Sequence, residues 1–397
     1  MPLTSFEDAR RMIEDTIPLA SSPQTLSLTE AAGRVLAAPL IATRANPSFD
    51  NSAVDGYLLG SPSANEGDEF NVVGEVRAGG ESQEAPTSGQ ALRIFTGAPV
   101  PPGGLCIVMQ EDVSRTGDRI RLTDGVKKGA AIRRVGADFA AGTELCPSGV
   151  RIGPAEIALA AWNGVSELSV FALPRISTAV TGDELVPLGE PLGYGQIHDS
   201  NGPMLGALAR ICGGATRAAG AIGDRLESVE AGLAQMTIDC DLIVVSGGAS
   251  VGDYDFVPAA IANLGEVFFH GVSIKPGKPT LFGRIGDAFV FALPGNPSSA
   301  YVCFQLFVRP AIRRMAGESS LQETWISARY GDDHEKAPRD EFVRVRLETR
   351  EDETWAIPVF EQGSFGLRSL SAAGALARLR LSTTYRSGDA VQCMILP

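Results

Sequence analysis

The sequence predicts an α/β protein that also contains β domains. In residues 175–317, short apolar strands alternate with segments of helical periodicity, which is typical of a mainly parallel, three-layer α/β domain with right-handed crossovers. Before and after this region the chain reads as short strands separated by turns. We therefore expect a multi-domain subunit with four parts: an N-terminal helical and linker domain (1–45 with 140–174), a small β domain (46–139), the α/β domain (175–317) and a C-terminal β-barrel-like domain (318–397).

The composition is that of a soluble globular protein, with 44% hydrophobic and 20% charged residues. A formal net charge of −13 disfavours nucleic-acid binding, because no basic stripe offsets it. No apolar run approaches the roughly 20 residues that span a bilayer. Residues 1–11 also lack the apolar core of a secretion signal, so we expect a cytoplasmic protein with no membrane partner. The six cysteines are widely spaced, which favours reduced thiols over disulfides or a zinc site.

The elements before the α/β region are short. Ser5 and Asp8 form a capping-box start for a first helix, and a second short helix is expected over residues 29–38. A polar loop with two carboxylates, residues 46–57, then leads into short strands and Gly-Asp turns that extend to residue 145. Read without further knowledge, the loop carboxylates Asp50 and Asp55 are typical turn formers.

Within the α/β region, carboxylates follow successive strands. Asp183 and Glu184 follow the first strand, Asp224 follows the second, and Asp253 and Asp255 follow the third. Ligands in parallel sheets lie beyond the carboxyl ends of the strands, so these side chains should converge on one rim. Such an all-oxygen set beside a phosphate loop fits Mg²⁺. For Asp183 and Asp224 alone, a capping role in turns remains an equal alternative.

A glycine loop and a helix start predict an anion site at the same rim. The loop, residues 246–255, follows a buried strand, and its glycines let backbone N–H groups approach an anion. Asn296 suits a helix N-cap and Pro297 the first position of a long helix to residue 317, whose free N–H groups would face the strand ends. Lys275 and Lys278, held in a proline-rich turn, are expected to bring positive charge there.

Two other motifs are discounted. Residues 247–252 have the glycine spacing of a P-loop, but Asp253 stands where that motif requires lysine. Ser250 lies in a formal G-x-S-x-G pattern with His270 as a conceivable base. The nucleophile elbow requires a helix directly afterwards, whereas a polar Asp-Tyr-Asp run follows, so a serine hydrolase is disfavoured.

Seven short motifs are distributed along the chain: residues 49–57 (FDNSAVDGY), 93–101 (RIFTGAPVP), 181–185 (TGDEL), 196–201 (QIHDSN), 246–255 (SGGASVGDYD), 274–279 (IKPGKP) and 293–297 (LPGNP). Taken together, these motifs closely resemble the molybdopterin molybdenumtransferases, the bacterial MoeA type and the gephyrin E domain. The resemblance covers nearly the whole chain.

The resemblance implies an enzyme that converts adenylylated molybdopterin and molybdate into molybdenum cofactor and AMP with Mg²⁺. It also implies an elongated homodimer, with the active site in a cleft between the α/β domain of one subunit and the β-rich arm of the other, and transient contact with a molybdopterin adenylyltransferase. Positions that match residues tied to activity are Asp55, Thr96, Asp138, Glu184, Asp224, Asp255, Pro294 and Pro297. Positions that match the oxyanion neighbourhood are Ser250, Lys275, Lys278, Arg339 and Ser369.

In the resulting hypothesis, carboxylates hold Mg²⁺ near the pyrophosphate, and lysines with Ser250 hold molybdate near the dithiolene. The expected metal ligands are Asp183, Glu184, Asp224, Asp253 and Asp255. The expected pterin-nucleotide and oxyanion contacts add Ser246, Gly247, Gly248, Pro294, Gly295, Asn296 and Pro297. Two alternatives remain: a molybdopterin adenylyltransferase, which shares the α/β domain, and a non-catalytic scaffold of the same fold. The sequence predicts a site for a tetrahedral metal oxyanion and does not distinguish molybdate from tungstate as the substrate.

Overall fold

The computed structural model describes residues 3–20, 22–80, 83–250, 252, 255–321 and 323–397. The chain forms two compact units. Unit 1 comprises residues 1–38, 148–154 and 167–397, and unit 2 comprises residues 39–147 and 155–166. Among the described helices, none has the length and hydropathy that crossing a bilayer would require.

A six-stranded sheet forms the centre of unit 1, and four of its neighbouring strands are parallel, as predicted. The remaining two pairings, β21 with β20 and β20 with β18, are antiparallel, so β20 alone runs in the opposite direction. The two-residue turn Gly286–Asp287, in which Gly286 has a φ of +57°, joins β20 to β21. In spatial order the strands are β16 (Ala215–Ile222), β13 (Arg175–Thr181), β17 (Leu242–Ser246), β21 (Ala288–Leu293), β20 (Leu281–Ile285) and β18 (Glu266–His270).

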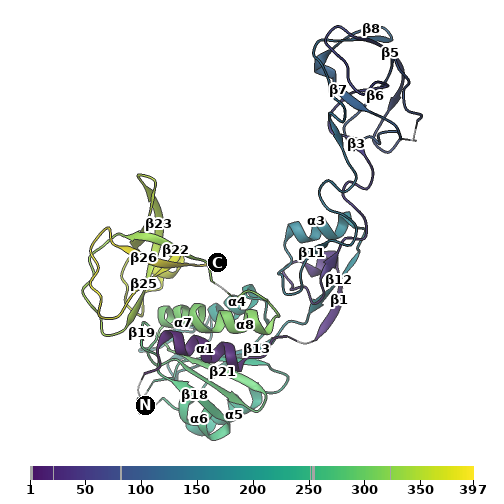
Figure 1. Ribbon diagram of the computed structural model, residues 1–397. Coiled ribbons are helices and arrows are strands. Elements are labelled where there is room, and N and C mark those ends of the chain that lie inside the picture. Colours follow the sequence, from purple (N-terminus) through teal and green to yellow (C-terminus); the bar gives the residue numbers. More distant parts are fainter. Residues whose placement is uncertain (1–2, 21, 81–82, 251, 253–254, 322) are drawn as a thin grey trace. The chain divides into compact units, whose positions relative to one another are not determined.

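Helices cover both faces of this sheet, so the predicted three-layer arrangement is confirmed (Figure 1). One core cluster joins the sheet to α1, α4, α7 and α8, and the other joins it to α5 and α6. The bounds are α1 (Phe6–Thr16), α4 (Asn201–Ile211), α5 (Leu226–Met236), α6 (Val257–Leu264), α7 (Pro297–Cys303) and α8 (Arg309–Met315). Two short strands, β14 (Leu185–Val186) and β15 (Ile197–His198), pair beside the sheet.

The long helix predicted from residue 296 to 317 is interrupted. Asn296 is the N-cap and Pro297 the first helical residue, as predicted, but a π-helical turn, η2 (Phe304–Val308), separates α7 from α8. Pro310 has no N–H and cannot bond the carbonyl of Leu306, which breaks the regular ladder. The side chain of Arg10 in α1 donates to that carbonyl instead, at 3.0 Å.

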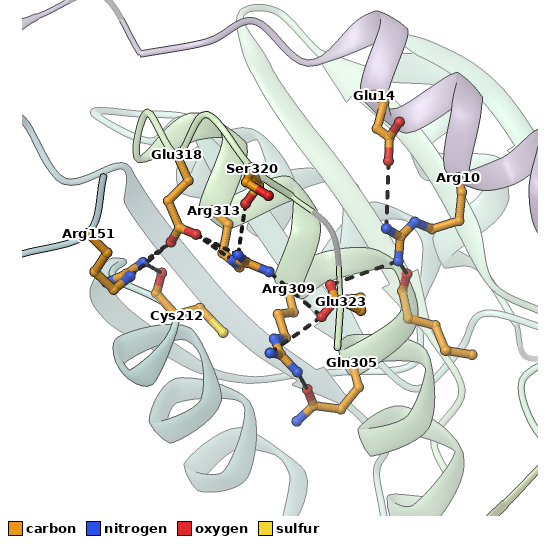
Figure 2. Close-up of polar contacts among 11 residues, drawn as sticks. Arg10, Glu14, Arg151, Cys212, Gln305, Arg309, Arg313, Glu318, Ser320 and Glu323 are labelled. Atoms are coloured by element: carbon orange, nitrogen blue, oxygen red, sulfur yellow. Dashed lines mark hydrogen bonds and ion pairs between the residues drawn. The ribbon is translucent and has the colours of Figure 1, made fainter. Parts of the chain in front are cut away.

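Buried ion pairs fix the segment that follows α8 (Figure 2). The side chains of Glu318 and Glu323 are only 7% and 1% exposed. Their partners are the guanidinium groups of Arg10, Arg151, Arg309 and Arg313. Because a buried carboxylate is costly unless it is paired, this network holds the connection between α8 and the next strand, β22.

The C-terminal part of unit 1 is a closed five-stranded barrel, because β23 pairs with both β24 and β25. A short sixth strand, β19 (Ile274–Lys275), pairs in parallel with the first two residues of β23 and sets Lys275 opposite Glu341. The barrel elements are β22 (Trp325–Tyr330), β23 (Asp340–Arg350), β24 (Glu353–Pro358), β25 (Ala375–Leu379) and β26 (Ala390–Ile395), with helix α9 (Arg368–Ala372) beside them. The β-barrel-like prediction is therefore confirmed.

The helix predicted over residues 29–38 is wrong. The helix α2 (Leu28–Ala31) ends after one turn, because Gly33 has a φ of +77° and Val35 and Leu36 form extended bridges with Arg151 and Val170. Strands β1 (Pro23–Ser27) and β12 (Glu167–Phe171) form an antiparallel pair beside it.

Unit 2 is rich in β structure, as predicted. Its main sheet has the order β7 (Cys106–Met109), β4 (Gly56–Leu59), β6 (Gln90–Ile94), β5 (Glu69–Val76), β9 (Arg119–Leu122) and β8 (Val113–Thr116). Two short pairs and two helical segments complete it: β3 (Asn51–Ser52) with β10 (Ile132–Arg133), β2 (Leu40–Ile41) with β11 (Glu144–Cys146), η1 (Gln110–Asp112) and α3 (Pro154–Trp162).

Candidate functional site

The first cavity of the site, about 510 Å³, lies at the carboxyl ends of the parallel strands of unit 1. Strands β13 and β17 supply Thr181 and Ser246, and the N-terminal ends of α4 and α7 supply Asn201 and Pro297. Ligand sites in parallel sheets occur at this edge. The predicted residues that line it are Glu184, Asp224, Ser246, Gly247, Gly248, Asp255, Gly295, Asn296 and Pro297.

The glycine loop lies close against the neighbouring strand end. Gly247 has a φ of +100°, and a Cβ there would lie 2.4 Å from the carbonyl oxygen of Thr181, so the loop requires glycine. The Ser246 hydroxyl is engaged internally, since it donates to the carbonyl of Pro294 at 2.9 Å. Asn201 was not predicted as a site residue, although it lies in one of the sequence motifs. Its side-chain amide donates to the carbonyl of Gly295 at 2.7 Å, and its buried Oδ1 has no hydrogen-bond partner.

Three of the predicted metal-ligand carboxylates, Glu184, Asp224 and Asp255, line this cavity. Burial, followed by the negative charges of Asp183, Glu184 and Asp255, raises the pKa of Asp224. The Asp183 N–H donates to Asp224 Oδ2 at 3.1 Å and the Asp224 N–H donates to Asp183 Oδ1 at 3.2 Å, which is the turn-capping role left open by the sequence. Asp253 lies outside the described residues. Among the described residues, no three carboxylate, histidine or cysteine side chains gather as a preformed metal site.

Lys275 and Lys278 line a second cavity, of about 570 Å³. We expected these lysines at the same edge of the sheet as the carboxylates, and this expectation is wrong. The strand that carries Lys275, β19, is not part of the central sheet but pairs with β23 of the barrel. The two cavities adjoin at the first turn of α7, where Asn296 lines one and Ser299 lines the other. The side-chain amide of Asn296 donates to the hydroxyl of Ser364, another lining residue of the second cavity, at 3.0 Å.

The structure separates the remaining oxyanion predictions. Arg339 lines the second cavity and donates to the carbonyl of Ile274 at 3.0 Å. Ser250 is exposed and lines neither cavity among the described residues. Ser369 is fully buried and donates to the carbonyl of Gly366 at 2.6 Å, so it also faces neither cavity.

Arg344 is a candidate that the sequence did not reveal. It is 1% exposed, and its Nη2 donates to the carbonyls of Glu361 and Gly363, both of which line the second cavity. Its Nε and Nη1 have no hydrogen-bond partner, and burial lowers the pKa of the guanidinium. No carboxylate among the described residues forms an ion pair with it. Its strand neighbours Val343 and Val345 belong to the barrel core, whereas Arg344 lies on the opposite face, which residues 361–363 cover.

In unit 2, the structure brings Asp55 and Thr96 together. Asp55 Oδ1 accepts from both the N–H and the hydroxyl of Thr96, at 2.8 Å each, and these bonds lower the pKa of Asp55. Asp138 is exposed and accepts from Asn46 at 2.8 Å. Asp50 binds Arg134 and the N–H of Val135, consistent with its predicted role in a turn.

Three family models match the chain in succession. They are the MoeA N-terminal region (domains I and II) over residues 4–164, the probable molybdopterin binding domain over 177–314 and the MoeA C-terminal region (domain IV) over 327–396. A molybdopterin molybdenumtransferase of Nostoc sp. is 33% identical over 100% of this chain and 94% of its own length. The chain belongs to the molybdopterin molybdenumtransferase family. The resemblance found in the motifs is therefore confirmed.

Other members of the molybdopterin molybdenumtransferase family agree with this assignment. Molybdopterin molybdenumtransferase 2 of Mycobacterium tuberculosis is 36% identical over 79% of this chain and 80% of its own length. The crystal structure of the molybdopterin biosynthesis moeA protein from Pyrococcus horikoshii superposes with a TM-score of 0.84, at 28% identity, covering 99% of this chain and 100% of that one.

Proposed function

We propose that this chain transfers molybdenum from molybdate to adenylylated molybdopterin and releases AMP. The observation that carries the proposal is the pair of adjoining cavities. One combines a glycine loop, two helix ends and carboxylates, and the other combines Lys275, Lys278 and Arg339. A pterin nucleotide in the first cavity and a metal oxyanion in the second would meet at the first turn of α7.

The residues of the first cavity fit a magnesium ion that arrives with the nucleotide. Mg²⁺ usually takes one or two carboxylates together with phosphate oxygens and water, so a preformed protein cage is not required. Glu184, Asp224 and Asp255 would hold it, and it would offset the charge of the phosphate oxygens. Burial, followed by the neighbouring carboxylates, raises the pKa of Asp224, and a partly buried carboxylate crowded by others favours a nearby cation, which supports this assignment.

The second cavity would hold the oxyanion through charge and hydrogen bonds. Lys275, Lys278 and Arg339 carry the positive charge, and Ser299 and Ser364 add hydroxyl groups. The chain needs no protein nucleophile in this scheme, because proximity of the two substrates carries the reaction. The buried guanidinium of Arg344 lies behind the wall and adds a positive field.

We further propose that the protein works as a cytoplasmic homodimer and receives its substrate from a molybdopterin adenylyltransferase. Asp55, Thr96 and Asp138 would then serve the site of the partner subunit. The hydrogen-bonded pair of Asp55 and Thr96 supports a preformed polar site in unit 2.

The decisive experiment offers purified protein adenylylated molybdopterin and follows AMP release. Release that requires both molybdate and Mg²⁺ is the expected result. Consumption of ATP with free molybdopterin would instead indicate an adenylyltransferase. Binding of the nucleotide without turnover, by a protein that unfolds in one cooperative thermal transition and is therefore folded, would indicate a scaffold.

A further inference from the structure

The second cavity contains a buried carboxylate that the proposed chemistry does not use. The side chain of Glu341 is 8% exposed, and it forms an ion pair with the ammonium group of Lys275, whose own side chain is 60% exposed. The Nε2 atom of His334 lies 2.7 Å from the other carboxylate oxygen. A buried negative group therefore occupies the wall of a cavity whose lysines and arginine suit an anion.

The position of Glu341 is fixed by the backbone. It lies in β23 and pairs there with Leu379 of β25 on one side and Lys275 of β19 on the other. Lys275, in contrast, has a long and largely exposed side chain that retains rotamer freedom. An entering oxyanion could thus attract the ammonium group toward itself, whereas the carboxylate, on a side chain that is only 8% exposed, has much less room to move.

The charges of the cavity wall are nearly balanced. Three cationic side chains and two carboxylates line it, which leaves a formal charge of +1. The cations are Lys275, Lys278 and Arg339, and the carboxylates are Glu341 and Glu361. Molybdate is a dianion, so the buried carboxylate opposes it directly, whereas the exposed Glu361 is screened by water.

We propose that Glu341 is the internal counter-ion of the oxyanion cavity, where it positions Lys275 before the oxyanion arrives and weakens the binding of dianions. A weakened site releases its oxyanion to the pterin instead of retaining it, because ground-state binding that is too tight opposes transfer. This inference rests on the proposed function of the second cavity. It assigns Glu341 as a positioning and specificity-determining residue.

The test measures the Kd of oxyanions by calorimetry for wild-type protein, Glu341→Gln and Glu341→Ala. Both variants should bind molybdate and tungstate roughly tenfold more tightly, because a unit charge beside a dianion is removed. The monoanion perrhenate has a similar tetrahedral shape, and its affinity should rise only about threefold, since the electrostatic effect halves with ligand charge. Glu361→Gln is the matched control in the same cavity, and its effect should stay below about twofold because that side chain is exposed.

In the AMP-release assay, Glu341→Gln should lower both the KM for molybdate and kcat. Equal gains for perrhenate and tungstate, or dianion binding that is unchanged or weaker in both variants, would overturn the counter-ion role while leaving the oxyanion cavity intact. If no protein, wild type included, binds any tetrahedral oxyanion, the proposed function of the cavity fails together with the inference. Two charge-removing variants are used so that the result does not depend on the folding of one.

Discussion

The side-chain amide of Asn296 donates a 3.0 Å hydrogen bond to the hydroxyl of Ser364. Asn296 lines the cavity with the glycine loop, and Ser364 lines the cavity with the lysines. This bond ties the helix end that would face the nucleotide to the loop that would face the oxyanion in the proposed function. The walls of the two cavities are therefore joined directly by a hydrogen bond.

Replacing Ser364 by alanine should weaken molybdate binding by roughly tenfold, because a hydroxyl that lines the second cavity is lost. Calorimetric titration measures the effect. Ser369→Ala is the matched control, since that hydroxyl bonds Gly366 and faces neither cavity. It should cost about 1 kcal/mol of unfolding free energy and leave the Kd unchanged. The reverse ranking of the two variants would place the oxyanion elsewhere.

Replacing Lys278 by glutamine should raise the Kd for molybdate by roughly tenfold in low salt and by less in high salt, because the lost interaction is a screened charge pair. Lys336→Gln removes an exposed lysine that lines neither cavity, and it should change the Kd by less than about twofold. A Lys278→Gln protein that inserts molybdenum at the normal rate at low molybdate concentration would contradict the assignment.

Replacing Asp224 by asparagine should stabilise the protein at neutral pH and impair its activity. The pKa of Asp224 is raised in the folded protein by burial and by neighbouring carboxylates, so ionisation of this group opposes folding. The stability difference between variant and wild type should shrink as the pH falls through the raised pKa of Asp224 and should vanish below the ordinary value of 3.8, where the carboxyl group is neutral in both the folded and the unfolded protein. Thermal melting across pH, with and without Mg²⁺, checks this; a Mg²⁺-dependent rise in Tm that survives unchanged in the variant would exclude Asp224 as a ligand.

The opposite sign is expected for Asp55→Asn in unit 2. Hydrogen bonds from Thr96 lower the pKa of Asp55, so the ionised form contributes stability above the ordinary pKa of 3.8 and loses it as the pH falls through the lowered value. The variant should melt at a lower temperature than the wild type at pH 7 and at the same temperature in strong acid. A constant difference across pH would mean that the ionised carboxylate is not what Thr96 stabilises.

The local signals of the sequence predicted much of the first cavity. The glycine loop, the Asn296 cap and the Pro297 start all depend on short-range rules, and each appears where it was expected. The prediction of an uninterrupted helix from residue 296 was wrong, although Pro310 is present in the sequence. The break leaves the carbonyl of Leu306 without its helical partner, and the side chain that donates to it, Arg10, lies 296 residues away in the chain.

The second cavity could not be assembled from the sequence, because it depends on pairing between distant strands. No signal in the sequence around Lys275 predicts that β19 pairs with β23 of the barrel. Because of this pairing, the lysines line a different cavity from the carboxylates. The burial of Arg344 could not be predicted for a similar reason. The alternation of side chains along a strand assigns each residue to one face of the sheet, but it does not say which residues cover that face.

The core cluster that contains α7 and α8 has a consequence for how unit 1 unfolds. Phe342, Leu376 and Met394 of the barrel belong to the same cluster as Phe304 and Phe307 beneath the central sheet. The barrel has an interior of its own, which includes Val345 and Cys393, but Phe342, Leu376 and Met394 pack outside it, in the cluster that it shares with the helices. Cutting the chain between α8 and β22 would therefore leave both fragments with apolar surface exposed to water. Differential scanning calorimetry should accordingly record the sheet and the barrel as one cooperative endotherm, and an isolated fragment of residues 323–397 should aggregate instead of refolding.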